Sequence, residues 1–382
     1  MKRTGSNVNT IKIDNSSLIL NCIRRHPISR IDIAKQTGLS KSAVTTIVKE
    51  LLDQGQITEI GTESTEQGRH PILLDIVADY RYAMGISLHR ETVCVCIVDL
   101  KFRHVASERR PTDSFATPEE AVDWAYETGL RLMDDNGIAH DRCIGIGIAS
   151  PGPLDDKRGL IMIPPNFSLF HHFNVKEHLA KKCNYPVFLN NAPVLKALYE
   201  NQMREDVPRK YALVSIDTGI GSAIIQDGNV YRGAYGLAGE IGHTTVDIDG
   251  DPCTCGQRGC LECYITKKAI VRRFSPESFE AAIDAAYRGD RAALDMIEYI
   301  ARYFAAGVVN LINLLDLEAV MLFGELNVRP DLLIARIQEY VNQHSIIAKV
   351  HPVTVFPSLI EPGDIEVYTA AQVLKRYFEQ AL

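Results

Sequence analysis

The chain lacks any hydrophobic run of the roughly 18 to 20 residues that a helix needs to cross a bilayer. Its basic start, Met-Lys-Arg, is not followed by the apolar stretch of a secretory signal, so we expect a cytoplasmic protein that does not contact membranes. Short-period repeats and low-complexity segments are missing too, and 46% hydrophobic with 23% charged residues excludes a disordered chain. Because 382 residues exceed what one core usually serves, we expect two or three domains.

Cysteine is sparse except in one short segment. Five of the nine cysteines are scattered through predicted core segments, which is typical of reduced thiols in the cytoplasm. The other four are Cys253, Cys255, Cys260 and Cys263, and His243 precedes them. Zinc binds four nitrogen or sulfur ligands at tetrahedral corners, and a C-x-C-x4-C hairpin with one histidine supplies such a set. The alternative is a chance group of buried cysteines, but so compact a cluster favours a structural zinc site.

Positive charge is scarce overall and concentrated near the N-terminus. Residues 1–52 carry nine Lys or Arg against three Asp or Glu, a net charge of +6 in a chain whose total is −7. A basic head on an acidic body is expected when only the head meets a polyanion such as DNA. Small solvated basic faces are a common alternative, so charge alone does not decide between them.

The basic head has the pattern of a helix-turn-helix. The segment Ser29-Arg-Ile-Asp32 predicts a capping box at the start of one helix, and Gly38-Leu39 predicts a tight turn after it. Ser40 caps a second helix, over residues 41–52. Its apolar residues recur at helical spacing and form one buried stripe, made of Val44, Ile47, Val48 and Leu51. An earlier helix at 16–25 and two short wing strands complete a winged helix-turn-helix over residues 1–78, with the strands at 56–60 and 72–76.

The other face of the second helix offers small polar and basic side chains that suit the major groove of DNA. These residues are Ser40, Lys41, Ser42, Thr45, Thr46 and Lys49. Arg69, in the loop between the wing strands, could enter a minor groove. The alternative is a three-helix packing module without DNA contacts. The turn, the caps and the basic face agree with one another, however, and predict binding to double-stranded operator DNA.

From about residue 79 the pattern changes to α/β. Short apolar strands are predicted at 83–88, 92–99, 143–149, 186–189, 211–216, 222–226 and 319–323. Helices are predicted between them, notably at 118–133, 194–202 and 297–315. Helix-separated strands predict sheets covered by helices on both faces. Two Gly-rich strand-turn-strand units predict a duplicated body over residues 79–382, with two lobes and a cleft between them.

Polar residues stand at several turns of this body. Asn166 ends an extended piece, Asn190 and Asn191 follow a strand, and Glu240 and Glu262 flank the predicted zinc ligands. Amides and carboxylates supply the donors and acceptors that sugar hydroxyls need. Taken singly, such residues are more often turn formers or helix caps.

Three motifs together resemble the ROK family, which contains sugar kinases and sugar-responsive repressors on an actin/hexokinase-like fold. They are Asp217-Thr-Gly-Ile-Gly221, Ala238-Gly-Glu240-Ile-Gly-His243 and Cys253-Thr-Cys255-Gly-Gln-Arg-Gly-Cys260-Leu-Glu262. The winged head resembles the repressor branch, because family kinases normally lack it. The resemblance implies a zinc-binding loop at about 243–263 and four zinc ligands: His243, Cys253, Cys255 and Cys260. It also implies sugar contacts from Asn166, Asn190, Asn191, Glu240, His243 and Glu262.

The departures from the kinase pattern are chemical. Family kinases receive phosphates at an Asp-x-Gly-Gly-Thr loop, where this chain has Gly85-Ile-Ser-Leu-His-Arg90, with bulky side chains that should block a nucleotide. The kinase base is the aspartate of an Asn-Asp pair, whereas this chain has Asn190-Asn191. An amide cannot accept the proton of a sugar hydroxyl, and losing general-base help costs about 10²–10⁴ in rate.

The sequence therefore predicts a transcriptional regulator that is not an enzyme, most simply a repressor of carbohydrate-utilisation genes. Its effector would be a sugar or a sugar phosphate, and a homodimer or homotetramer would present paired heads to DNA half-sites. Two alternatives stay open at this point. One is an ATP-dependent sugar kinase with an added DNA-binding head, and the other is a DNA-bound protein whose signal is a protein partner.

Overall fold

The computed structural model describes residues 8–62, 71–216, 219–324, 331–361 and 366–380. The chain divides into two compact units. Unit 1 comprises residues 1–195, 202–205 and 365–382, and unit 2 comprises residues 196–201 and 206–364. No helix within the described ranges is both long enough and apolar enough to cross a membrane. Arg69 and the first two residues of the Asp217–Gly221 motif lie outside the described residues.

The N-terminal part of unit 1 is a winged helix-turn-helix. Its elements are α1 (Val8–Arg25), β1 (Ile28–Ser29), α2 (Arg30–Thr37), α3 (Lys41–Asp53), β2 (Ile57–Thr62) and β3 (Ile72–Ile76), with the strands in the order β1-β3-β2. Both predicted caps are confirmed, because Ser29 Oγ accepts from the Asp32 N–H and Ser40 Oγ from the Ala43 N–H, each at 3.2 Å. Gly38 ends α2 with φ of 72°, a conformation that favours glycine.

The stripe predicted on α3 is buried as expected. Val44 and Val48 are fully buried, and Ile47 and Leu51 nearly so, while the opposite face of the helix stays exposed. The predicted domain boundary after residue 78 falls beside the short 3-10 helix η1 (Ala78–Tyr80) and stays a prediction.

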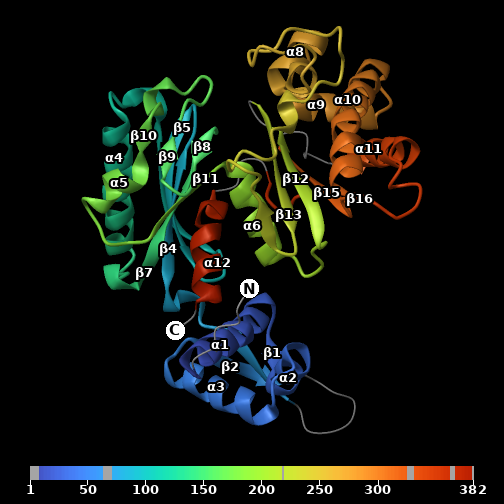
Figure 1. Ribbon diagram of the computed structural model, residues 1–382. Helices are drawn as coiled ribbons and strands as arrows, with labels where there is room; N and C mark the ends of the chain where they lie inside the picture. The colour runs from blue at the N-terminus through green and yellow to red at the C-terminus, as the bar shows by residue number, and fades with distance from the viewer. Residues whose placement is uncertain (1–7, 63–70, 217–218, 325–330, 362–365, 381–382) are drawn as a thin grey trace. The chain divides into compact units, whose positions relative to one another are not determined.

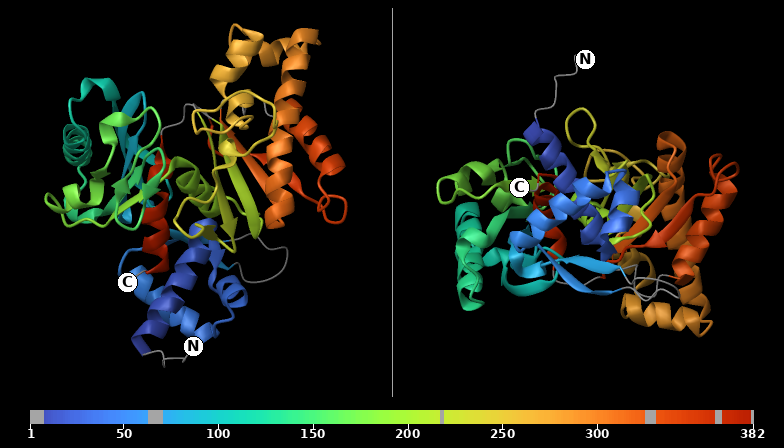
Figure 2. Two further views of the ribbon diagram at one scale, coloured as in Figure 1. Left: turned by 45° about the horizontal axis from the view of Figure 1, so that its top comes forward. Right: turned by 90° about the horizontal axis from the view of Figure 1, so that it is seen from below.

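The rest of unit 1 is built on a five-stranded sheet in the order β6-β5-β4-β7-β11. Its strands are β4 (Tyr82–Leu88), β5 (Thr92–Asp99), β6 (His104–Pro111), β7 (Cys143–Ala149) and β11 (Val187–Asn190). Side chains alternate across a sheet, and on β4 Met84 meets Gly129 of α4 (Pro118–Asp135), while Gly85 faces Thr369 of η7 (Val367–Ala370). Helix α4 therefore covers one face, and η7 with α12 (Ala371–Glu379) covers the other (Figures 1 and 2).

A long connection leaves β7 and returns to the sheet at β11. It holds a small sheet of β8 (Leu154–Asp155), β9 (Leu160–Ile161) and β10 (Phe173–Asn174), with the 3-10 helix η4 (Ser168–Phe170) before β10, and then α5 (Val175–Ala180). Helix α6 (Ala192–Met203) follows β11 in the chain.

Unit 2 repeats the same sheet topology. Its five strands lie in the order β14-β13-β12-β15-β16. In each sheet the first three strands form an antiparallel meander, the fourth strand pairs in parallel with the first, and the fifth pairs in parallel with the fourth. The strands are β12 (Lys210–Ile216), β13 (Ile220–Gln226), β14 (Asn229–Tyr231), β15 (Ala319–Gly324) and β16 (Thr354–Pro357). The helices are α7 (Glu262–Ile265), α8 (Lys267–Phe274), α9 (Phe279–Tyr287), α10 (Arg291–Leu315) and α11 (Asp331–His344). The predicted duplication is confirmed.

Within unit 1, α1 of the head contacts α12. Asn21 Nδ2 donates to the Phe378 carbonyl at 3.0 Å, and the Arg24 guanidinium lies 4.7 Å from the centre of the Phe378 ring. Arg24 Nη1 also donates to Gln202 Oε1 at 2.5 Å, and burial lowers the pKa of this arginine to about 10. One positive charge of the basic head is thus half-buried and packed against side chains of the same unit.

Candidate functional site

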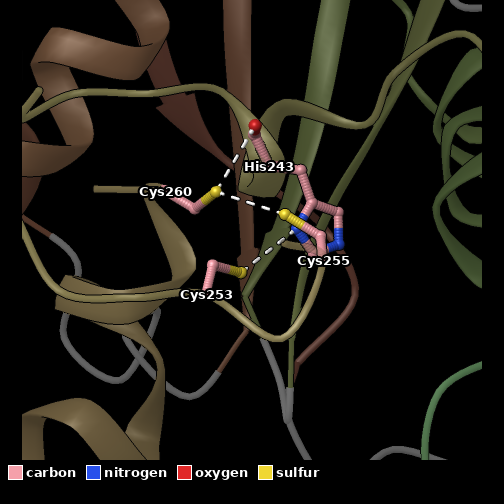
Figure 3. A group of neighbouring side chains, drawn as sticks. All are labelled: His243, Cys253, Cys255 and Cys260. Carbon is pink, nitrogen blue, oxygen red and sulfur yellow. Dashed lines mark hydrogen bonds between the residues drawn. The ribbon is translucent and has the colours of Figure 1, made fainter. Parts of the chain in front are cut away.

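The four predicted zinc ligands converge in unit 2 (Figure 3). One ring nitrogen of His243 and the three sulfurs of Cys253, Cys255 and Cys260 all lie within 4.8 Å of one another. The Cys255 and Cys260 sulfurs are 3.6 Å apart, and the Cys253 sulfur is 3.7 Å from His243 Nδ1. A tetrahedral ion with metal–sulfur bonds of about 2.3 Å would have an edge of roughly 3.8 Å between sulfurs. The group can therefore hold a metal ion, and its donor set suits zinc.

Local turns bring the sulfurs together. The Cys253 N–H donates to the Gln257 carbonyl at 2.8 Å, and the Gly256 N–H donates back to the Cys253 carbonyl at 3.1 Å. Gly259 has φ of 66°, and a Cβ there would lie 1.6 Å from the Asp247 carbonyl oxygen, so only glycine fits. The chain reverses between the second and third cysteines because of this close approach.

The thiols differ in how readily they lose a proton. Burial raises the pKa of Cys253, and burial together with the neighbouring Cys255 and Cys253 sulfurs raises the pKa of Cys260. A hydrogen bond from the Gln257 N–H lowers the pKa of Cys255. A divalent cation among the sulfurs would replace the protons and neutralise the repulsion between thiolates.

The predicted sugar-contacting residues of unit 2 lie against this cluster. Glu262 Oε1 is 3.5 Å from His243 Nδ1 and 3.3 Å from the Cys253 sulfur. Partial desolvation of its carboxylate and the nearby Glu262 raise the pKa of Glu240, although the residue as a whole is exposed, while His243 acts in the opposite direction. His243 turns Nδ1 toward the cysteine sulfurs, so Nε2 is the ring nitrogen left for a ligand hydroxyl.

The predicted sugar-contacting asparagines belong to unit 1. Asn190 is the last residue of β11 and is buried. Asn191 caps α6, because its Oδ1 accepts from the Val194 N–H at 3.1 Å. Asn166 is exposed and has φ of 55°, a left-handed conformation that asparagine tolerates better than most residues. The cap on α6 uses one lone pair of the Asn191 amide oxygen and leaves its NH₂ group chemically able to donate.

The predicted DNA-contacting face of α3 is exposed. All six of its residues are solvent-accessible, namely Ser40, Lys41, Ser42, Thr45, Thr46 and Lys49. The hydroxyls of Thr45 and Thr46 donate to the carbonyls of Lys41 and Ser42, one helical turn earlier, which leaves the oxygen lone pairs outward. The face thus offers acceptors and two lysine cations.

The motifs did not single out every side chain that supports these residues. The sequence pattern indicates Arg90 only as an obstacle to a nucleotide, yet its guanidinium donates to the Pro165 carbonyl, beside Asn166. The two residues are 75 positions apart, and no local spacing signals such a pair.

Comparison with known proteins covers both parts of the chain. A family model described as "ROK family" matches residues 83–361. The chain belongs to the ROK family. A second model, described as winged helix-turn-helix DNA-binding, matches residues 14–58.

Individual relatives match over most of their length. The xylose repressor of Bacillus subtilis is 30% identical over 316 residues, which cover 81% of this chain and 82% of the repressor. The DNA-binding transcriptional dual regulator NagC of Escherichia coli K12 is 27% identical over 361 residues, covering 90% and 88%. Both matched relatives are named as DNA-binding or repressor proteins.

Solved structures share the fold to different extents. A ROK family transcriptional regulator, a homologue of the E. coli MLC protein, superposes with a TM-score of 0.79 at 24% identity and covers 97% of both chains. A ROK hexokinase from Thermus thermophilus gives a TM-score of 0.64 at 25% identity and covers 78% of this chain and 98% of its own. The fold of the regulator thus extends over nearly the whole chain, whereas that of the hexokinase does not.

Proposed function

We propose that this protein is a DNA-binding transcriptional repressor of carbohydrate-utilisation genes, controlled by a sugar or a sugar phosphate. The proposal rests on one observation, namely that two features occur together in this ROK chain. One is α3, with its capped start and exposed polar face. The other is an amide at Asn191, where the family's kinases have their base and where a hydroxyl can be bound but not deprotonated.

The metal in this proposal is zinc, and its role is structural. His243, Cys253, Cys255 and Cys260 would supply four ligands, which leaves no position for a reactive water molecule. Bound zinc would fix the tautomer of His243, so that Nε2 can meet a sugar hydroxyl. The effector contacts are proposed to be Asn166, Asn190, Asn191, Glu240, His243 and Glu262.

The DNA contacts in this proposal are Ser40, Lys41, Ser42, Thr45, Thr46 and Lys49 on α3, together with Arg69. Helix-turn-helix proteins usually bind two DNA half-sites about one helical turn apart, so we propose a homodimer or a homotetramer. A repressor reaches chromosomal DNA in the cytoplasm, which is where we place the protein.

The test is a DNA-binding titration with the full-length protein. Duplexes selected from the source genome would be titrated with and without D-xylose, N-acetylglucosamine and their phosphate esters. We expect tight binding to a selected duplex, and a change of at least about tenfold in its dissociation constant with one compound. Absence of sequence-selective DNA binding would contradict the proposal.

Two other outcomes would each redirect the interpretation. ADP release at about 1–100 s⁻¹ with any of these sugars would identify a kinase with an added head. Selective DNA binding without heat of binding to any sugar would instead favour control by a protein partner.

A further inference from the structure

The loop that carries Asn166 is unusual in how its backbone is held. It runs from Met162 to His172 and closes on itself where the His172 N–H donates to the Met162 carbonyl at 2.8 Å. Pro164 and Pro165 precede Asn166, and proline has no N–H to donate. Across these two residues the backbone can therefore be anchored only through its carbonyl oxygens.

Two side chains bind these carbonyl oxygens, one from the same loop and one from the turn between β4 and β5. His171 Nε2 lies 3.0 Å from the Pro164 carbonyl oxygen. Arg90 donates to the Pro165 carbonyl oxygen from both Nε and Nη2, at 3.1 and 3.0 Å. Phe167, on the other side of Asn166, is buried and stacks on Phe170 with ring centres 4.6 Å apart. Asn166 is thus fixed on both sides while its own side chain stays exposed.

Arg90 is itself held firmly. It lies in the turn between β4 and β5, which is closed by the His89 N–H donating to the Thr92 carbonyl at 3.0 Å. Buried Thr112 braces this turn, because its Oγ1 donates to the His89 carbonyl at 2.8 Å and its N–H to the Glu91 carbonyl at 3.0 Å. The braced turn thereby directs the planar guanidinium of Arg90, with its N–H donors, toward the Pro165 carbonyl.

We propose that Arg90 is a positioning residue for effector recognition, which acts by setting the backbone that presents Asn166. The inference rests on the proposed sugar-binding function. Asn166 has φ of 55°, which costs free energy, so a free loop would populate other conformations. In family kinases the turn between β4 and β5 receives nucleotide phosphates. Here the same turn would hold the loop that carries Asn166.

The test is a double-mutant cycle on the full-length protein, read by calorimetry with whichever compound of the sugar panel the wild type binds. We expect Arg90→Ala and Asn166→Ala each to weaken binding by roughly tenfold, the scale of one lost hydrogen bond. In the double variant the loss should stay near tenfold and not reach the product of the two, because Arg90 acts through Asn166. DNA affinity without sugar should be unchanged in all three variants.

A matched control is Arg142→Ala, which removes another arginine that donates to a backbone carbonyl, that of Tyr80, before the start of β4 and so at the opposite end of this strand from Arg90. It should leave sugar binding unchanged. If Arg90→Ala does not fold, Arg90→Lys keeps the charge without the fork and should weaken binding by an intermediate factor. Unchanged sugar affinity in Arg90→Ala or Arg90→Lys, or losses that multiply with Asn166→Ala, would overturn the inference. A wild type that binds no sugar would instead overturn the proposed function.

Discussion

Two loops of this protein present candidate sugar-binding residues, and they are held by different chemistry. The loop over residues 243–263 is mostly exposed, and its cysteines and His243 converge on one point where a metal ion can bind. The Met162–His172 loop has no such cluster, and it is anchored by buried Phe167 and Phe170 and by side chains bonded to proline carbonyls. A bound metal ion can thus stabilise an exposed loop in the way that buried apolar side chains stabilise the other loop.

The largest effect should come from breaking the proposed zinc-binding loop over residues 243–263. Cys255→Ser removes one exposed proposed ligand and should reduce zinc content from about one ion per chain to a small fraction of that. The melting temperature should fall by about 10 °C or more, because binding free energy is folding free energy in such loops. Elemental analysis and differential scanning calorimetry measure both quantities.

Cys263→Ser is the matched control for this variant. Cys263 lies beside the cluster, with its sulfur 4.0 Å from the Pro252 carbonyl, but it is not one of the four converging residues. Its replacement should leave zinc content unchanged. Equal zinc loss in both variants would show that the ligand set is wrong.

The next effect should come from the anchored loop. Phe170 is fully buried, and Phe170→Ala should destabilise unit 1 by about 3–5 kcal/mol while zinc content stays at the wild-type level. Chemical denaturation with parallel metal analysis separates the two loops. Loss of zinc in this variant would mean that the loops are not independently held.

Much of this architecture is predictable from the sequence because its signals are local. The caps at Ser29 and Ser40, the stripe on α3 and the cysteine spacing all lie within a few residues of one another, and each is confirmed in position. The half-buried edge strand β6 (His104–Pro111) has no apolar alternation, so the sequence pattern does not predict a strand there.

Long-range pairs are where the sequence fails as a guide. The charge pattern places Arg24 in the positive DNA-binding head, but its guanidinium is half-buried and packs against Phe378 and Gln202. The sequence pattern likewise indicates only an obstructive role for Arg90, since its partner Pro165 is 75 residues away. Such contacts follow from packing, which residue spacing does not encode.

A smaller effect tests the individual sugar contacts on the two loops. Glu240→Gln, beside the proposed zinc-binding loop, and Asn166→Ala, on the anchored loop, should each weaken sugar binding by about tenfold. Neither should alter zinc content or DNA affinity in the absence of sugar. The measurement is calorimetry with the sugar that the wild type binds. Weaker binding in only one of the two variants would show that only one loop contacts the sugar.

The smallest expected effect is on catalysis. Asn191→Asp restores a carboxylate at the position of the family's kinase base and can still accept the Val194 N–H that caps α6. We nevertheless expect ADP release to stay far below about 1 s⁻¹, because the β4–β5 turn carries His89 and Arg90 in place of a phosphate-receiving glycine loop. A coupled ADP-release assay decides the point, and brisk turnover would show that the amide alone had silenced a kinase.

The central claim is that sugar binding to the body controls DNA binding by the head. The most direct measurement is the affinity of the full-length protein for a selected genomic duplex, by fluorescence anisotropy, across a sugar titration. We predict that the dissociation constant shifts by at least about tenfold for the wild type, and that an Asn190→Ala, Glu240→Gln variant binds the same DNA without responding. A wild-type affinity that stays constant at saturating, calorimetrically verified sugar would contradict the account.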